Sequence, residues 1–217
     1  MGPSVSGESK ARVKYFGFYT SLVSMICYLL FDIAAAAGMS GLISSPFVIS
    51  LSWYAPSLLL AYSFLGMIIA LHFDEISGVP LYSFCAIVLA VVYVTLNSFV
   101  YIIQVLIVAP SFITGNFADV AMFEVAEGKP FWAVNGLAYT IMGFSTLMAS
   151  FSIRGTGLNR AIRILLLVHG IVAPAVLGAV MFKPFFILSS TVGLTYPIAA
   201  TLVSIYMWRT RKEICRQ

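Results

Sequence analysis

Hydrophobic residues along the chain fall into six long runs separated by short polar segments. The runs lie at roughly residues 15–38, 46–71, 82–109, 131–152, 161–182 and 185–208. Each is about 20 residues or longer, and a helix of that length crosses a hydrocarbon core about 30 Å thick. The pattern therefore predicts an all-α fold, in which residues 1–217 form a single integral membrane bundle of six transmembrane helices.

Lysine and arginine residues are distributed unevenly over the two sides of this predicted bundle. If every run crosses the membrane, ten of the twelve basic residues lie on the side that holds both termini. These are Lys10, Arg12, Lys14, Arg154, Arg160, Arg163, Arg209, Arg211, Lys212 and Arg216, whereas Lys129 and Lys183 lie on the other side. Loops rich in lysine and arginine stay in the cytoplasm. The sequence therefore predicts a protein of the plasma or inner membrane with both termini cytoplasmic.

Composition agrees with a membrane location. Hydrophobic residues make up 61% of the chain and charged residues 9%, against about 25% charged residues in soluble domains. The net charge of +4 comes from the basic residues that orient the chain in the membrane. It predicts attraction to anionic lipid head groups at the cytoplasmic face. With no nucleic-acid-binding motif and no metal-ligand spacing in the sequence, we expect no nucleic acid, metal or cofactor. Three scattered cysteines, Cys27, Cys85 and Cys215, give no disulfide framework.

The longest loop, residues 111–130, is expected on the outer face and mixes apolar with acidic residues. Asn116 followed by Asp119 is typical of a helix start, and Gly128 is typical of a helix end. The sequence therefore predicts a short helix from Asn116 to about Glu127 that lies on the membrane surface.

Polar side chains inside the predicted spans point to a functional site, because each costs free energy in the bilayer unless it is paired. They fall at two depths, near the outer side for Asp32, Gln104 and Asn135, and deeper for Asn97, Tyr101 and Tyr139. In one interpretation these six residues line a cavity open to the outer side, where the carboxylate supplies charge or a titratable proton and the amides orient a ligand. In the other they form hydrogen bonds between helices, worth about 0.6 kcal/mol each.

A serine and a histidine at similar depth in neighbouring spans raise a second possibility. Ser145, within Gly143-Phe144-Ser145, and His169 lie at one level from the cytoplasmic side. This is the geometry of an intramembrane serine hydrolase, but the sequence offers no third orienting group and no oxyanion donor. The alternative is a histidine bonded to a neighbouring backbone or hydroxyl group, and we expect a protein that is not an enzyme.

Charged residues on the cytoplasmic side suggest two further sites. His72, Asp74 and Glu75 offer a low-specificity cation site, or they pair with the arginines of residues 154–163 across the same surface. The segment 155–160 opens the fifth span at a helix N-terminus, where an anion can bind. Anionic lipid head groups are the anion that we expect there.

Two sequence patterns concern how the spans are arranged. Residues 55–61 (APSLLLA) resemble residues 173–179 (APAVLGA) at equivalent places in the two halves of the chain, which suggests an inverted repeat of three spans each. Small residues spaced for close helix packing occur at Ala34 and Gly38, and at Gly170 and Gly178. These stripes support an alternative function, a structural or accessory subunit that packs against a membrane partner or a second copy.

Three segments carry a resemblance to known sequences: residues 97–104 (NSFVYIIQ), residues 135–139 (NGLAY) and residues 158–163 (LNRAIR). Together they resemble a group of small, uncharacterised prokaryotic multi-pass membrane proteins. The resemblance covers spans three to six and implies a compact six-helix bundle. It implies no assigned activity, so no functional residue is carried over. The leading expectation is a membrane protein that binds or transports a small molecule or lipid.

Overall fold

The computed structural model describes residues 7–74, 78–182 and 184–214, and every regular element among them is helical. Of the residues discussed above, Glu75, Lys183, Cys215 and Arg216 lie outside the described part of the chain. The predicted all-α class is confirmed. The principal helices are α1 (Gly7–Met39), α2 (Pro46–Phe73), α3 (Pro80–Ile103), α6 (Pro130–Ser152), α7 (Leu158–Val172), α8 (Pro174–Met181) and α9 (Phe185–Ile214).

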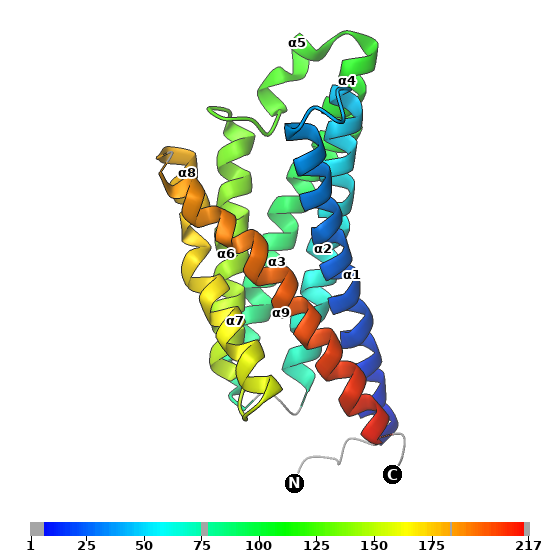
Figure 1. The fold of residues 1–217 in the computed structure, drawn as a ribbon, viewed down its shortest axis with the longest axis vertical. Helices are drawn as coiled ribbons and strands as arrows, with labels where there is room; N and C mark the ends of the chain where they lie inside the picture. The colour runs from blue at the N-terminus through cyan, green and yellow to red at the C-terminus, as the bar shows by residue number, and fades with distance from the viewer. Residues whose placement is uncertain (1–6, 75–77, 183, 215–217) are drawn as a thin grey trace.

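These helices pack as a closed ring around a common centre. Helix α1 packs on α2 and on α9, α2 packs on α3, α3 on α6, α6 on α7, and α7 on α9. Helix α9 runs diagonally across the front of the bundle from α8 to the start of α1 (Figure 1). Since α1 begins and α9 ends at the same end of the bundle, the charged ends of the chain lie together (Figure 1).

Four of the principal helices begin at a proline. Pro46, Pro80, Pro130 and Pro174 occupy the first turns of α2, α3, α6 and α8. Proline is favoured there because its fixed φ suits the helix and its missing N–H has no intrahelical partner at that position. Each predicted span therefore corresponds to a helical segment, and the helices extend a few residues beyond most of the predicted bounds.

Five helices in the described chain are long and apolar enough to cross a membrane: Glu8–Met39, Pro46–Phe73, Pro80–Thr114, Leu158–Val180 and Thr191–Arg211. The fourth predicted span is also a helix, α6, but it is not among these five. Its buried face carries hydroxyl groups as well as apolar side chains, and the hydroxyl groups include those of Thr140, Ser145 and Thr146. These side chains lower the mean hydropathy of α6 without exposing a charge.

The third span contains a turn of π-helix. Helix α3 passes into η1 (Gln104–Val108) and then into α4 (Ala109–Thr114). Within the π turn, the Ala109 N–H donates to the Gln104 carbonyl. Pro110 follows directly, and because proline has no N–H the regular ladder cannot continue there. Such turns shift the rotational phase of the residues that follow them.

The outer loop is less helical than the sequence predicts. It forms only α5 (Phe117–Val120) and the 3₁₀ turn η2 (Ala121–Phe123). Asn116 makes no capping bond to α5, because its side-chain oxygen accepts a hydrogen bond from the Thr114 hydroxyl. A short helix in the loop is therefore confirmed, but the predicted extension to Glu127 is wrong.

The small-residue stripes make contacts inside the chain. A Cβ added at Gly170 would lie 2.7 Å from the Gly143 carbonyl oxygen, so α6 and α7 approach closely there. A Cβ at Gly178 would lie 3.1 Å from the Phe185 ring, and one at Gly38 would lie 3.4 Å from the Trp53 ring. The stripes therefore give no argument for a partner chain.

The two similar proline segments differ in structure. Helix α2 continues through Pro56, whereas the fifth span is interrupted at Ala173, where α7 ends and α8 begins at Pro174. The inverted repeat stays a prediction.

Candidate functional site

An aromatic and polar cluster fills the centre of the ring of helices, and we call it the central cluster. Its members are Tyr28, Phe64, Tyr93, Tyr139, His169 and Tyr196, which come from α1, α2, α3, α6, α7 and α9. The Phe64 ring lies 5.3 Å from that of Tyr93 and 5.9 Å from that of Tyr196. Centroid separations of this size are typical of favourable aromatic pairs. Every segment of the ring therefore contributes one aromatic or imidazole side chain to the same core.

Several polar atoms in this centre have no hydrogen-bond partner among the described residues. They are the Tyr93 hydroxyl, both amide atoms of Asn97 and Nε2 of His169. Asn97 lies near enough to the Tyr93 hydroxyl to interact with it, but the two side chains do not have the geometry of a hydrogen bond, and all three side chains are 0% exposed. Buried polar groups are nearly always hydrogen-bonded, so each exception requires an explanation. The cluster thus combines aromatic faces with unused donors and acceptors.

Asp32 lies at the outer edge of the central cluster. It is half-buried and interacts electrostatically with Tyr28 and Tyr139. No ion pair joins it to a basic residue in the part of the chain that the structure describes. An acidic side chain inside a membrane span normally has a partner. Asp32 is therefore an acidic side chain without a basic partner among the described residues.

The remaining predicted residues divide into two groups. The Tyr101 hydroxyl donates to the Tyr139 hydroxyl at 3.0 Å, which joins α3 to α6 beside the central cluster. Oδ1 of Asn135 is buried without a described partner. Gln104 points elsewhere: its amide donates to the Phe123 carbonyl at 2.6 Å and accepts from the Val125 N–H at 3.3 Å.

Gln104 therefore fastens the outer loop to the third span. It also lines a small pocket of about 160 Å³ together with Trp53, Tyr54 and Glu124. None of the other five predicted residues lines this pocket. Gln104 is the first residue of the π turn, and its side chain contacts the 111–130 loop rather than the central cluster.

The hydrogen bonds of Ser145 and His169 go to other residues rather than to each other. The Ser145 hydroxyl donates to the Ala86 carbonyl of α3 at 2.7 Å, and Nδ1 of His169 bonds to the Thr195 hydroxyl of α9 at 3.2 Å. Each side chain has the neighbouring backbone or hydroxyl partner expected for a structural group. The described residues also hold no cluster of three or more histidine, cysteine or acidic side chains that would bind a metal ion.

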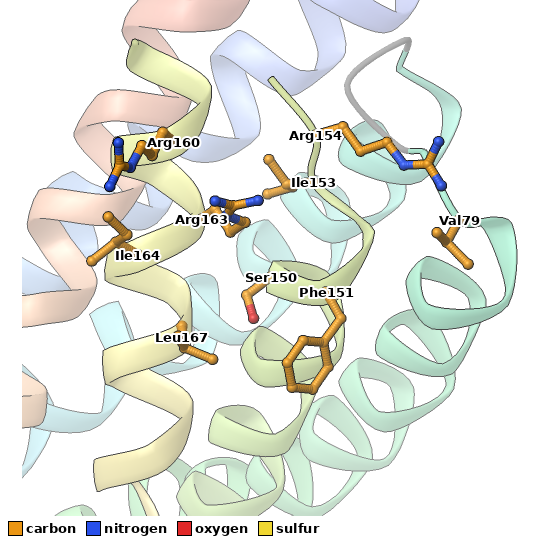
Figure 2. Close-up of a pocket in the computed structure, with 9 residues that line it drawn as sticks. All are labelled: Val79, Ser150, Phe151, Ile153, Arg154, Arg160, Arg163, Ile164 and Leu167. Carbon is orange, nitrogen blue, oxygen red and sulfur yellow. The ribbon is translucent and has the colours of Figure 1, made fainter. Parts of the chain in front are cut away.

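A second candidate site lies at the end of the bundle that holds the chain ends. It is a pocket of about 600 Å³ between α6 and α7, which we call the arginine pocket. Its polar rim consists of Arg154, Arg160 and Arg163. Figure 2 shows Arg163 between the two helices, with Arg160 and Arg154 on either side. Apolar side chains, among them Phe151 and Ile164, form its wall.

The predicted pairing of Asp74 with these arginines is wrong. Asp74 instead forms an ion pair with Lys14, whose ammonium group also donates to the Tyr206 hydroxyl at 3.2 Å. Lys14 and Asp74 are only 5% and 6% exposed. His72 bonds through Nδ1 to the Ser83 hydroxyl at 2.8 Å. The predicted cation site therefore does not form from His72 and Asp74.

The charge pattern of the sequence presents Lys14 only as a residue that orients the chain in the membrane, so it does not predict the buried pair of Lys14 with Asp74. A pattern was available: Lys14 is in helical register with Gly17, Ser21 and Ser24, at steps of three and four residues. Those residues form the buried face of α1, where Ser21 and Ser24 are 0% exposed. A lysine on that face required a buried partner.

These observations define a helical multi-pass membrane protein. No protein family, curated protein or solved structure was found to match the chain. The resemblance to small prokaryotic membrane proteins stays a prediction, and the function rests on the geometry of the chain.

Proposed function

We propose that the chain crosses the membrane six times, with both termini in the cytoplasm. Helix α6 has 23 residues, which corresponds to about 34 Å at 1.5 Å per residue. It packs between α3 and α7 in the ring. Its hydroxyl groups are bonded to carbonyl groups, as in the bonds of Thr140 to Gly136 and of Thr146 to Gly143. Bonded hydroxyl groups reduce the cost of placing a polar helix in lipid.

The charge distribution supports the orientation. Lys14 and the three arginines of the arginine pocket lie at the end where α1 begins and α9 ends (Figure 1). The described basic residue at the other end is Lys129, which pairs with Glu124 at 2.5 Å. Positive charge is retained on the cytoplasmic side. Basic side chains at that end then face anionic lipid head groups.

We further propose that the central cluster binds, and in a transport cycle moves, a small molecule that enters from the outer side. The observation that carries this proposal is the set of unpartnered buried atoms of Tyr93, Asn97 and His169. A purely structural core would leave few such atoms, because an unmet buried donor or acceptor costs about 1–3 kcal/mol. A ligand with hydrogen-bonding groups would satisfy them. We propose no chemical reaction at this site.

The chemistry of the site favours a ligand with a positive charge. Asp32 has no described basic partner, and the tyrosines at positions 28 and 139 lie within its electrostatic reach. Aromatic faces attract cations, and a desolvated ammonium group gains about 2 kcal/mol from such a contact. A small organic ammonium ion fits both features.

Thermal unfolding of the purified protein with tetramethylammonium as the probe tests this proposal. We expect the unfolding temperature to rise with tetramethylammonium chloride but not with sodium chloride at equal ionic strength. Asp32→Asn should abolish the rise, whereas Asp119→Asn, which changes an exposed outer carboxylate, should keep it. An absent rise in the wild type, or equal rises in all three proteins, would contradict the proposed site.

A further inference from the structure

We propose that the arginine pocket is a specific binding site for the phosphate head group of one anionic phospholipid. This inference depends on the proposed cytoplasmic placement of this end of the bundle, but not on ligand binding at the central cluster. It differs from general attraction to the membrane surface, because it assigns the lipid to one crevice between α6 and α7.

The three arginines have no acidic partner among the described residues. Glu8 and Asp74 are the acids at this end whose side chains the structure describes. Glu8 bonds to Arg12 at 2.6 Å, and Asp74 pairs with Lys14. The described lining of the arginine pocket contains no carboxylate. As far as the described residues go, the three guanidinium groups around this pocket are therefore available to bind an anion.

Guanidinium groups suit phosphate in particular, because their planar N–H donors match pairs of phosphate oxygens. The start of α7 adds to this attraction. Gly157 is the N-cap of α7 and provides no side-chain bond to the first N–H groups of the helix. The positive end of a helix with free N–H groups favours an anion. Arg160 and Arg163 lie in the first two turns of the same helix.

The side-chain stem of Arg154 packs against Gly78. A Cβ added at Gly78 would lie 2.0 Å from Cδ of Arg154, so the arginine stem crosses the bare glycine backbone. The Gly78 N–H donates to the Ser152 carbonyl at 2.7 Å, which fastens this segment to the end of α6. Arg154 therefore reaches the pocket by a defined route.

The apolar wall distinguishes a lipid from a soluble phosphate. Phe151 and Ile164 are 49% and 44% exposed, and both lie beside the arginine rim. Leu167 continues the wall one turn farther along α7 (Figure 2). Acyl chains of a phospholipid would cover these side chains, and a free phosphate ion would not. Basic pockets between transmembrane helices on the cytoplasmic side commonly bind acidic phospholipids.

Native mass spectrometry of the protein released from detergent, with phosphatidylglycerol or phosphatidylcholine added in turn, tests the proposal. We expect one tightly retained phosphatidylglycerol and at least tenfold weaker retention of phosphatidylcholine. Arg160→Gln combined with Arg163→Gln should weaken phosphatidylglycerol retention at least tenfold. Arg209→Gln is the matched control, because Arg209 is exposed at the same end but lies outside the pocket; we expect less than a twofold change.

Two more measurements keep the test decisive. Gly78→Ala leaves every charge in place but displaces the Arg154 stem, and we expect a three- to tenfold loss of retained phosphatidylglycerol. Addition of glycerol 3-phosphate, which carries the phosphate without acyl chains, should not displace the lipid at equal concentration.

Four results would overturn the lipid site: no retained phosphatidylglycerol in the wild type, equal losses in the pocket and Arg209 variants, no loss in the Gly78 variant, or displacement by glycerol 3-phosphate. None of these results concerns tetramethylammonium binding, so this proposal and the proposed function can fail separately.

Discussion

Two buried polar groups in this protein are built in opposite ways. At the end of the bundle where α1 begins and α9 ends, the Lys14 ammonium group of α1 bonds both to Asp74, the C-cap of α2, and to the Tyr206 hydroxyl of α9. In the centre, Tyr93, Asn97 and His169 are more deeply buried, yet they keep donors or acceptors without a described partner. The first arrangement uses its polar groups to hold helices together. The second leaves them available, and this difference separates a structural polar group from a candidate binding site.

Removal of the acidic partner of Lys14 should give the largest effect on stability. We expect Asp74→Ala to lower the free energy of unfolding by about 3 kcal/mol, because it leaves the Lys14 charge buried and unpaired. Titration with sodium dodecyl sulfate in mixed micelles measures this change. The control is Glu8→Ala, which removes an exposed pair with Arg12 and should cost less than about 0.5 kcal/mol.

The double variant Lys14→Met with Asp74→Leu sharpens this result. Replacement of both charges by apolar groups is often neutral, so the double variant should be more stable than Asp74→Ala alone. If Asp74→Ala is as stable as the wild type, the pair does not hold the helices and the comparison fails.

An apolar substitution in the centre should act in the opposite direction. We expect Asn97→Leu to raise the free energy of unfolding by about 1 kcal/mol, because it removes two unpartnered buried polar atoms. The same variant should lose the response to tetramethylammonium. Ser145→Ala is the control, since its hydroxyl is bonded to the Ala86 carbonyl and its loss should destabilise the protein. A destabilised Asn97→Leu protein would show that Asn97 has a structural partner.

The smallest effect is expected where one hydrogen bond joins the edge of the cluster to its neighbour. Tyr101→Phe removes the hydroxyl that donates to Tyr139 and should lower the free energy of unfolding by about 0.6 kcal/mol. Tyr19→Phe, at a side chain that is 56% exposed, should leave stability unchanged. Equal free energies of unfolding for the two variants, measured in the same titration, would show that this hydrogen bond does not stabilise the protein.

The sequence was sufficient to place the helices, because long apolar runs and starting prolines mark them directly. It was not sufficient for contacts that depend on helix rotation. Depth along a helix does not say which way a side chain points, and the side-chain bonds of Gln104 go to Phe123 and Val125 of the 111–130 loop. Asp74 was assigned to the wrong basic partner because residues from α1 and α2 meet only in the folded ring.

The arginine pocket shows an intermediate case. The sequence predicted that Arg154, Arg160 and Arg163 lie on one side of the membrane and that anionic lipid binds there. It did not predict the apolar wall or the crossing of Arg154 over Gly78, because both depend on how α6, α7 and the start of α3 pack. The sequence singled out Tyr139 of the central cluster, with Asn97 and Tyr101 beside it, whereas Tyr28 and Tyr196 look like ordinary core residues in the sequence.

The most direct test of the central claim is the accessibility of position 32 from outside the cell. Asp32→Cys, in a protein without its three native cysteines, is treated with a membrane-impermeant thiol reagent in intact cells. The account predicts labelling that tetramethylammonium slows. Labelling only after the cytoplasmic side is opened, or labelling that tetramethylammonium leaves unchanged, would contradict an outward-opening site at the centre of the bundle.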